Sequence, residues 1–169
     1  MPPRFATPEW RTLVFDTGPL WELALFNAVR GPLGFASLEG ELQHLREHSS
    51  YEALSKFVAH FHGKTTTPHV VAEISARITR ATDRKGQPAV WNLVYHEFSS
   101  MGMDEGVMKL LEMPQELVAR IGAVDVSILE LGRSLNSAQP LVLSVDTALI
   151  AECKRAGLQA LHLWEVIST

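Results

Sequence analysis

The chain has 169 residues, of which 46% are hydrophobic and 20% charged, the size and composition of a single folded domain rather than of a disordered chain. Fifteen Lys and Arg against nineteen Asp and Glu give a net charge of -4, so the chain lacks the overall basic excess that nucleic-acid-binding proteins usually carry. One cysteine, Cys153, excludes an internal disulfide, and since the sequence shows neither a membrane helix of roughly 18–20 apolar residues nor a secretory signal, we expect one cytoplasmic domain over residues 1–169 with no membrane contact.

The first predicted element is a buried strand at residues 12–16, TLVFD, a continuous apolar run that ends on an acid. Such a run is typical of a parallel strand that is covered on both faces. The Thr-Gly-Pro punctuation of residues 17–20, TGPL, predicts a turn, and the mostly apolar residues 20–29 predict a helix after it. The chain therefore opens as a strand, a turn and a helix.

An enlarged helical segment is predicted at about residues 30–66. Residues 31–40 have the composition of a loop. Residues 41–62 carry apolar side chains at near-helical spacing, and this pattern is broken around Ser49 and Ser50. The segment is therefore expected to contribute two helices to the fold.

The middle of the chain opens with a strong helix start, because Thr67 is a good N-cap and Pro68 fits the first helical position. This helix should run through VVAEISARITRAT and stop by DRKGQP. The elements predicted after it are a helix at 89–99, a strand at 107–112, a helix from Pro114 to about Ile121 and, after a stop at Gly122, a helix at 124–135.

The last part of the chain predicts two strands around a helix. Residues 141–146, LVLSVD, form a second apolar strand that ends on an acid. The run TALIAECKRAG predicts a helix with Gly157 as its C-terminal stop, and LQALHLW predicts a final strand. This order of strands and helices is typical of an α/β domain with a largely parallel sheet, and right-handed crossovers would place helices on both faces.

Four acids, Asp16, Glu73, Asp125 and Asp146, are predicted to meet at one edge of this sheet. Asp16 and Asp146 end two strands, and open α/β sheets bind ligands at the edge where the carboxyl ends of the strands lie. Glu73 falls in the second turn of one predicted helix and Asp125 in the first turn of another. Converging carboxylates indicate a hard cation such as Mg²⁺, which prefers oxygen ligands. Taken singly, each Asp also fits a turn or helix-cap role.

Four segments, LVFDTGPL, TPHVVAEIS, VDVSILELG and LVLSVDTALI, resemble, in this order, the motifs of the PIN-domain family of nucleases. Those motifs are an apolar strand ending in Asp-Thr or Asp-Ser, a helix carrying a Glu, an Asp at a helix start, and a Thr or Ser two residues before an Asp. The resemblance spans nearly the whole chain. It implies the family's three-layer α/β/α sandwich around a mainly parallel sheet.

The resemblance also implies a Mg²⁺ or Mn²⁺ site made by the four acids, with Thr17 and Ser144 as supporting hydroxyls. The chain would then hydrolyse RNA phosphodiester bonds. Bacterial members of the family are often VapC-like toxins that an antitoxin protein blocks, although the stretch before Glu73 is longer here than in such toxins. A homodimer is a further expectation, because apolar helices lie near Trp21 and Trp91.

Three arginines follow Glu73 at helical spacing, namely Arg77, Arg80 and Arg84. On an α-helix they share one face, so Arg77 and Arg80 are candidates for gripping successive phosphates of a nucleic acid. The alternative is a solvated helix face with an intrahelical Glu–Arg pair, which we favour for Arg84.

Other candidate residues have weaker patterns. His44 and His48 share a helical face with Glu41 and could bind zinc, but no third strong ligand is evident, so a surface face is favoured. Trp21 could stack on a base and is favoured as a core or partner-contacting residue. Cys153 lies in an amphipathic helix and is interpreted as buried packing.

Two further classes of function remain to be weighed against a nuclease. A non-catalytic RNA- or protein-binding module could be built on the same fold. A different phosphate enzyme is disfavoured, because Thr17 and Gly18 after Asp16 do not provide the second Asp of a haloacid-dehalogenase phosphatase. The segment GPLGFASLEG also lacks the Gly-Lys-Ser/Thr ending of a P-loop.

Overall fold

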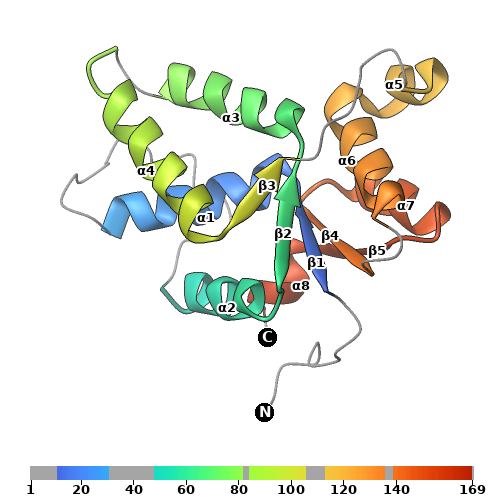
Figure 1. Cartoon of the computed structure of the whole chain (residues 1–169), viewed down its shortest axis with the longest axis horizontal. Coiled ribbons are helices and arrows are strands. Elements are labelled where there is room, and N and C mark those ends of the chain that lie inside the picture. The colour runs from blue at the N-terminus through green and yellow to red at the C-terminus, as the bar shows by residue number, and fades with distance from the viewer. Residues whose placement is uncertain (1–10, 31–47, 82–83, 106–112, 136–138, 169) are drawn as a thin grey trace.

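The structure is a computed structural model that describes residues 11–30, 48–81, 84–105, 113–135 and 139–168. Within these ranges the core is one sheet of five strands in the order β3-β2-β1-β4-β5 (Figure 1). Every neighbouring pair is parallel, so the predicted mainly parallel sheet is confirmed. The strands are β1 (Thr12–Phe15), β2 (Gly63–Thr66), β3 (Met103–Glu105), β4 (Pro140–Ser144) and β5 (Gln159–His162).

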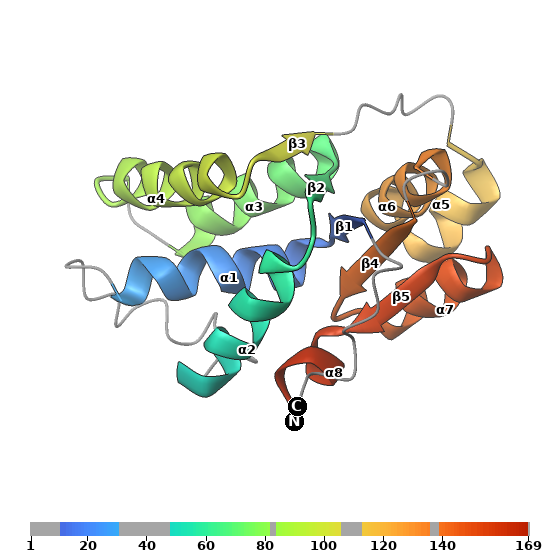
Figure 2. The ribbon, with the colours of Figure 1, turned by 60° about the horizontal axis from the view of Figure 1, so that its bottom comes forward.

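Helices cover both faces of the sheet, which confirms the three-layer α/β/α sandwich (Figure 2). The chain moves from β1 to β3 in one direction across the sheet and then to β4 and β5 in the other. Because crossovers between parallel strands are right-handed, this reversal sends the later helices to the opposite face. The first group is α1 (Thr17–Arg30), α2 (His48–Ala59), α3 (Pro68–Ala81) and α4 (Gln87–Ser100), and the second is α5 (Gln115–Ile121), α6 (Ala123–Ser134) and α7 (Thr147–Arg155).

A short last helix, α8 (Leu163–Ile167), follows β5 and packs against α2. Its first residues were predicted as part of the final strand, and that part of the prediction is wrong. The strand ends at His162, whose side chain accepts a hydrogen bond from the amide of Trp164 while Glu165 accepts one from the His162 amide. This reciprocal capping box starts a helix where the apolar pattern alone favours a strand.

The turn predicted at residues 17–20 is wrong, because α1 begins directly at Thr17. Asp16 directly follows β1, and its carbonyl accepts a hydrogen bond from the Leu20 amide at 3.3 Å. Pro19 therefore lies in the first helical turn, where a missing N–H breaks no hydrogen bond. The acid that follows β1 is thus also the residue from which α1 starts.

The enlarged segment at about residues 30–66 is only partly described. The second of the two predicted helices is α2, which begins at His48, next to the break predicted around Ser49 and Ser50. Residues 31–47 lie outside the described ranges, and with them the other predicted helix. The segment also contains β2, which the sequence analysis missed.

Strand β2 has the sequence GKTT, without an apolar run. Its threonines face a buried environment, where the Thr66 hydroxyl donates to the Phe15 carbonyl at 2.9 Å. On its far side, β2 pairs with β3, which lies just before the strand predicted at 107–112. Residues 106–112 lie outside the described ranges, so that prediction stays a prediction.

The apolar side chains of β1, β4 and the flanking helices form one core cluster. Its largest fully buried members include Trp21, Phe15 and Ile128. In the described part of the chain, no helix is both long and apolar enough to cross a membrane. The prediction of one domain over 1–169 is consistent with this single core and stays a prediction for the residues not described.

Gly18 lets the first turn of α1 approach the loop after β4. A Cβ placed at Gly18 would lie 2.5 Å from a γ-carbon of Val145, which is closer than two non-bonded carbon atoms can approach. The branched Val side chain has few rotamers with which to move away. The close approach therefore requires glycine at this position.

We predict that Gly18→Ala lowers the free energy of unfolding by about 1–3 kcal/mol, the usual cost of overpacking a tight contact. In a Val145→Ala background the same substitution should cost much less, because the clashing methyl is gone. Urea unfolding of the four proteins of this double-mutant cycle measures the difference. Equal costs in both backgrounds would contradict the close approach.

Candidate functional site

The site lies where the strand order reverses, between β1 and β4. These two strands are neighbours in the sheet, with Phe15 opposite Leu143. The chain leaves β1 through α1 on one face and leaves β4 through α7 on the other. Such a reversal opens a crevice at the carboxyl ends of the strands, and ligands of open α/β sheets bind there. Asp16 follows β1 directly, and Asp146 lies two residues after β4.

Asp16 lies buried at this reversal of strand order, with 5% of its surface exposed. Its Oδ1 accepts a hydrogen bond from the Thr17 amide at 2.6 Å, and its Oδ2 accepts one from the Ser144 hydroxyl at 2.5 Å. Burial raises the pKa of Asp16 above its ordinary value although both hydrogen bonds act to lower it. The negative charges of Glu73 and Asp146 raise that pKa further, which shows that both acids lie within electrostatic reach.

Asp146 is the N-cap of α7. Its Oδ1 accepts hydrogen bonds from the amides of Ala148 at 2.6 Å and Leu149 at 3.2 Å. Its own amide donates to the Ser144 hydroxyl oxygen at 2.8 Å. The helix-cap role that a lone Asp suggests is therefore real. Within the described residues, its second oxygen, Oδ2, accepts no hydrogen bond and remains available for a ligand.

Thr17 connects Glu73 to the same centre. The Thr17 hydroxyl donates to Oε2 of Glu73 at 2.9 Å, across from α1 to α3. The other oxygen of Glu73, Oε1, accepts from the Arg77 guanidinium at 3.1 Å. The two hydroxyls predicted as supporting groups, Thr17 and Ser144, thus lie between Asp16 and the other acids and hold them in place.

Asp125 lies in the first turn of α6 and is partly buried. Among the described residues it has no hydrogen-bond or ion-pair partner. Burial raises its pKa to about 7, and the charges of Asp16, Asp146 and Glu73 add to the rise. All four predicted acids therefore share one electrostatic neighbourhood, although they come from four different elements.

A pair of buried hydroxyls fixes the helices that carry Glu73 and Asp125. The Thr67 and Ser127 hydroxyl oxygens lie 2.8 Å apart, which ties the start of α3 to the first turns of α6. Thr67 also caps α3 by accepting from the Val70 amide at 3.3 Å, as predicted. Ser127 was not singled out from the sequence. The available signal was a small hydroxyl within an otherwise apolar buried helix face, VDVSIL.

The donor set fits a hard cation such as Mg²⁺ or Mn²⁺ better than zinc or copper, since it consists of carboxylate and hydroxyl oxygens. In the described ranges, no three His, Cys, Asp or Glu side chains are close enough to form a metal-holding group as they stand. Hydrogen-bonded groups separate some of the acids, since the Ser144 hydroxyl lies between the Asp16 carboxylate and the Asp146 amide, and Thr17 contacts both Asp16 and Glu73. Mg²⁺ commonly binds through one or two carboxylates and retains several waters, and such an arrangement would suit acids spaced in this way.

The predicted row of arginines along α3 is shorter than expected. Arg77 forms the intrahelical ion pair with Glu73. Arg80 is exposed in the last turn of α3. Arg84 lies in a turn beyond the end of α3 at Ala81, so its placement on the helix face is wrong. Only two guanidiniums therefore extend from Glu73 along this helix.

Two of the remaining candidates, Trp21 and Cys153, lie in the core. Trp21 is fully buried in the core, which leaves no face for a base. Cys153 is buried as predicted, and burial raises the pKa of its thiol to about 12. Glu41 and His44 lie outside the described residues, as does the side chain of His48, so the zinc alternative stays untested.

Comparison with known proteins found no match to the chain among family models, curated proteins or solved structures. Inference about function therefore depends on the geometry of the site and on the resemblance of its motifs.

We predict that Asp125→Asn stabilises the metal-free protein above neutral pH. The folded protein holds the Asp125 proton with a pKa of about 7, against about 3.9 in an unfolded chain. Protonation therefore favours folding, and this contribution is lost as the pH rises from about 4 to about 7. The amide carries no charge and escapes the loss. After allowing for solvent screening, the melting temperature at pH 8 in EDTA should rise by about 2–4 °C.

Below about pH 4 the variant and the unchanged protein should melt at the same temperature. Glu130→Gln is the matched control, because Glu130 lies on the same helix and is paired with Arg133. It should not raise the melting temperature at pH 8. A large drop for Asp125→Asn at every pH would mean that Asp125 has a structural role instead.

Proposed function

We propose that the chain is a metal-dependent endoribonuclease that resembles PIN-domain nucleases. The observation that carries the proposal is Asp16 at the reversal of strand order, whose pKa is raised by burial and further by the charges of Glu73 and Asp146. The hydroxyls of Thr17 and Ser144 place those two acids beside it. Carboxylates with strongly shifted pKa values occur most often at functional sites, where like charges are held close together for a chemical purpose.

The cofactor would be Mg²⁺ or Mn²⁺. When bound, such a cation lowers the pKa of water, orients a phosphodiester and neutralises developing negative charge. The four acids would hold it, Asp16 and Asp146 from the strand ends and Glu73 and Asp125 from the helices. Thr17 and Ser144 keep the carboxylates of Glu73 and Asp16 oriented, so that they do not have to reorganise when the cation binds.

RNA is the proposed substrate, and Arg77 and Arg80 would contact its backbone beside the acids. Arg77 neutralises Glu73 in the structure and could exchange that partner for a phosphate when Glu73 binds the cation. A cytoplasmic toxin of a toxin–antitoxin pair is the setting that the motif resemblance suggests, with an antitoxin protein and a second copy of this chain as partners.

A non-catalytic module that binds RNA or protein is the alternative. It is favoured by one observation, namely that both oxygens of Asp16 already accept hydrogen bonds within the chain. In that case the carboxylate would serve to join β1, α1 and β4 rather than to bind a cation. The two roles differ in what happens when a single site acid is neutralised.

We predict that Asp146→Asn abolishes Mn²⁺-dependent cleavage of a mixed-sequence RNA while the fold persists. Asn caps a helix as well as Asp does, so α7 keeps its start, whereas the charge that a cation needs is gone. Asp16→Asn should also abolish cleavage, with a larger loss of stability because Asp16 is buried. Gel analysis of end-labelled RNA measures the cleavage, and the products should carry 5′-phosphates.

Glu130→Gln should cleave like the unchanged protein, since Glu130 lies outside the four acids. Mn²⁺ should also raise the melting temperature of the unchanged protein but not that of Asp146→Asn. Full cleavage by both the Asp16 and Asp146 variants would end the proposal. Mn²⁺ stabilisation without any cleavage of RNA would support the non-catalytic module.

A further inference from the structure

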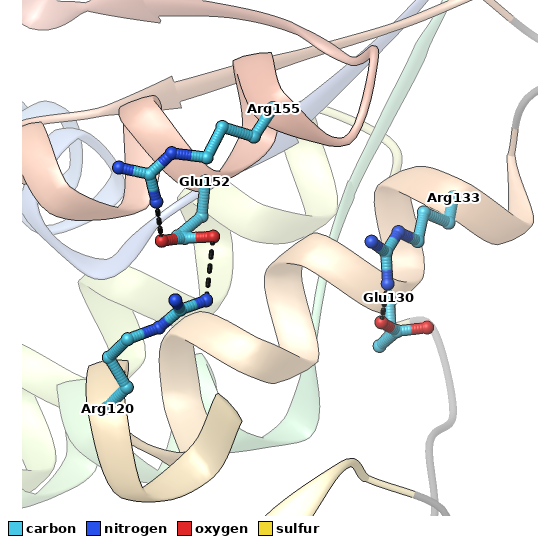
Figure 3. Close-up of polar contacts among 5 residues, drawn as sticks. All are labelled: Arg120, Glu130, Arg133, Glu152 and Arg155. Atoms are coloured by element: carbon cyan, nitrogen blue, oxygen red, sulfur yellow. Dashed lines mark hydrogen bonds and ion pairs between the residues drawn. The ribbon is translucent and has the colours of Figure 1, made fainter. Parts of the chain in front are cut away.

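Two arginines from different helices converge on one carboxylate outside the proposed metal site (Figure 3). Glu152, on α7, accepts a hydrogen bond at Oε2 from Arg120 of α5 at 3.0 Å. Its Oε1 accepts from Arg155, one turn further along α7. Both oxygens of the acid are thus engaged, each by a different guanidinium. We call these three residues the arginine pair and its carboxylate.

The cluster carries an excess of positive charge at the surface. The side chain of Glu152 is 11% exposed, whereas those of Arg120 and Arg155 are 60% and 66% exposed. A guanidinium has five N–H donors, and here each uses part of its donors on the buried acid. The remaining donors face solvent. The three residues together carry a net charge of +1. By contrast, Arg133 and Glu130 on α6 form a pair of one cation and one anion.

The fixed geometry makes the pair suitable for phosphate. Arginine recognises phosphate through a planar fork of donors, and anchoring that fork beforehand reduces the entropy lost on binding. An isolated surface ion pair contributes little to stability, commonly 0–1 kcal/mol. Glu152 is nearly buried and needs partners for its own charge, and the two guanidiniums that satisfy it also present their other donors at the surface.

The pair also lies on the elements that carry two of the site acids. Glu152 is six residues after the Asp146 cap of α7, about 9 Å along the helix at 1.5 Å per residue. Arg120 lies in the last turn of α5, five residues before Asp125 and across Gly122, whose φ is 89°. The pair and two of the four acids are therefore carried by neighbouring segments of the chain.

We propose that Arg120 and Arg155 form a phosphate-binding pair for the backbone of single-stranded RNA, outside the site of the four acids. Glu152 acts as a positioning residue that aligns the two guanidiniums. The inference rests on the proposed function for its substrate class, but it concerns binding and needs no cation. It assigns the RNA a path across α5 and α7, in addition to the side of α3 that carries Arg77.

The test measures RNA binding as a function of salt in full-length protein carrying Asp146→Asn, so that the probe is not cut. Fluorescence anisotropy of a short labelled mixed-sequence RNA gives the dissociation constant between about 50 and 200 mM salt. Losing one phosphate contact to a single strand lowers the salt slope by about 0.7. We expect that decrease for Arg120→Gln and for Arg155→Gln, with no change for the matched control Arg133→Gln.

Glu152→Gln separates RNA binding from a purely structural tie between α5 and α7. It keeps the size of the side chain but removes the charge that aligns the two guanidiniums, so RNA should bind more weakly even though the net charge becomes less negative. A purely structural tie would lower the melting temperature without weakening RNA binding. Salt slopes for the Arg120 and Arg155 variants equal to that of Arg133→Gln, with no loss of binding for Glu152→Gln, would overturn the inference. Changed slopes together with no cleavage by the protein that retains Asp146 would instead overturn the proposed nuclease and leave this binding site intact.

Discussion

The fold around the site depends on satisfying one buried carboxylate, that of Asp16. An ionised carboxyl group that leaves water must have hydrogen-bond donors or a cation nearby, or it takes up a proton. Here one donor is the Thr17 amide at the start of α1 and the other is the Ser144 hydroxyl at the end of β4. Satisfying Asp16 therefore requires β1 and β4 to be neighbours and α1 to begin without a turn. Gly18 permits the second requirement, because it lets that helix start against Val145.

The same arrangement leaves negative charge without full compensation. Asp16 has two donors and Glu73 has Arg77, but Asp125 has none of these partners among the described residues. Its raised pKa is the thermodynamic sign of that imbalance. A chain selected for stability alone could relieve it with an amide, so retaining the acid is consistent with stability being given up at a functional site. The proposed cation would restore the balance.

Much of this arrangement could be predicted from sequence, where the local pattern determines the structure. β1 and β4 are apolar runs followed closely by acids, and Thr67-Pro68 starts α3 as expected. β2 could not be found in this way, because GKTT lacks the apolar residues, continuous or alternating, that indicate a strand. It forms a strand because β1 and β3 offer it partners on both sides, and such non-local pairing is invisible to a local pattern.

The hydroxyl bridges were harder to predict than the acids for the same reason. Ser144 could be proposed because it precedes Asp146 by two residues, but its bond to Asp16 spans 128 positions. The contact between Thr67 and Ser127 depends on how α3 meets α6 at the edge of the sheet. Neither residue needs the other for its own helix to form. Such contacts become predictable only once the packing of the elements is known.

The net charge of -4 is a poor guide to nucleic-acid binding in this chain, because an approaching ligand meets local groups of charges. Asp16 and Glu152 are nearly buried, whereas Arg80, Arg120 and Arg155 are exposed. At physiological ionic strength, screening limits the reach of an exposed charge to about 8 Å, so an approaching phosphate responds to the nearest cations rather than to the total. The acids near Asp16 then favour a cation there, while exposed guanidiniums on neighbouring helices favour an anion. A phosphodiester with its counter-cation is the kind of ligand that meets both demands at once.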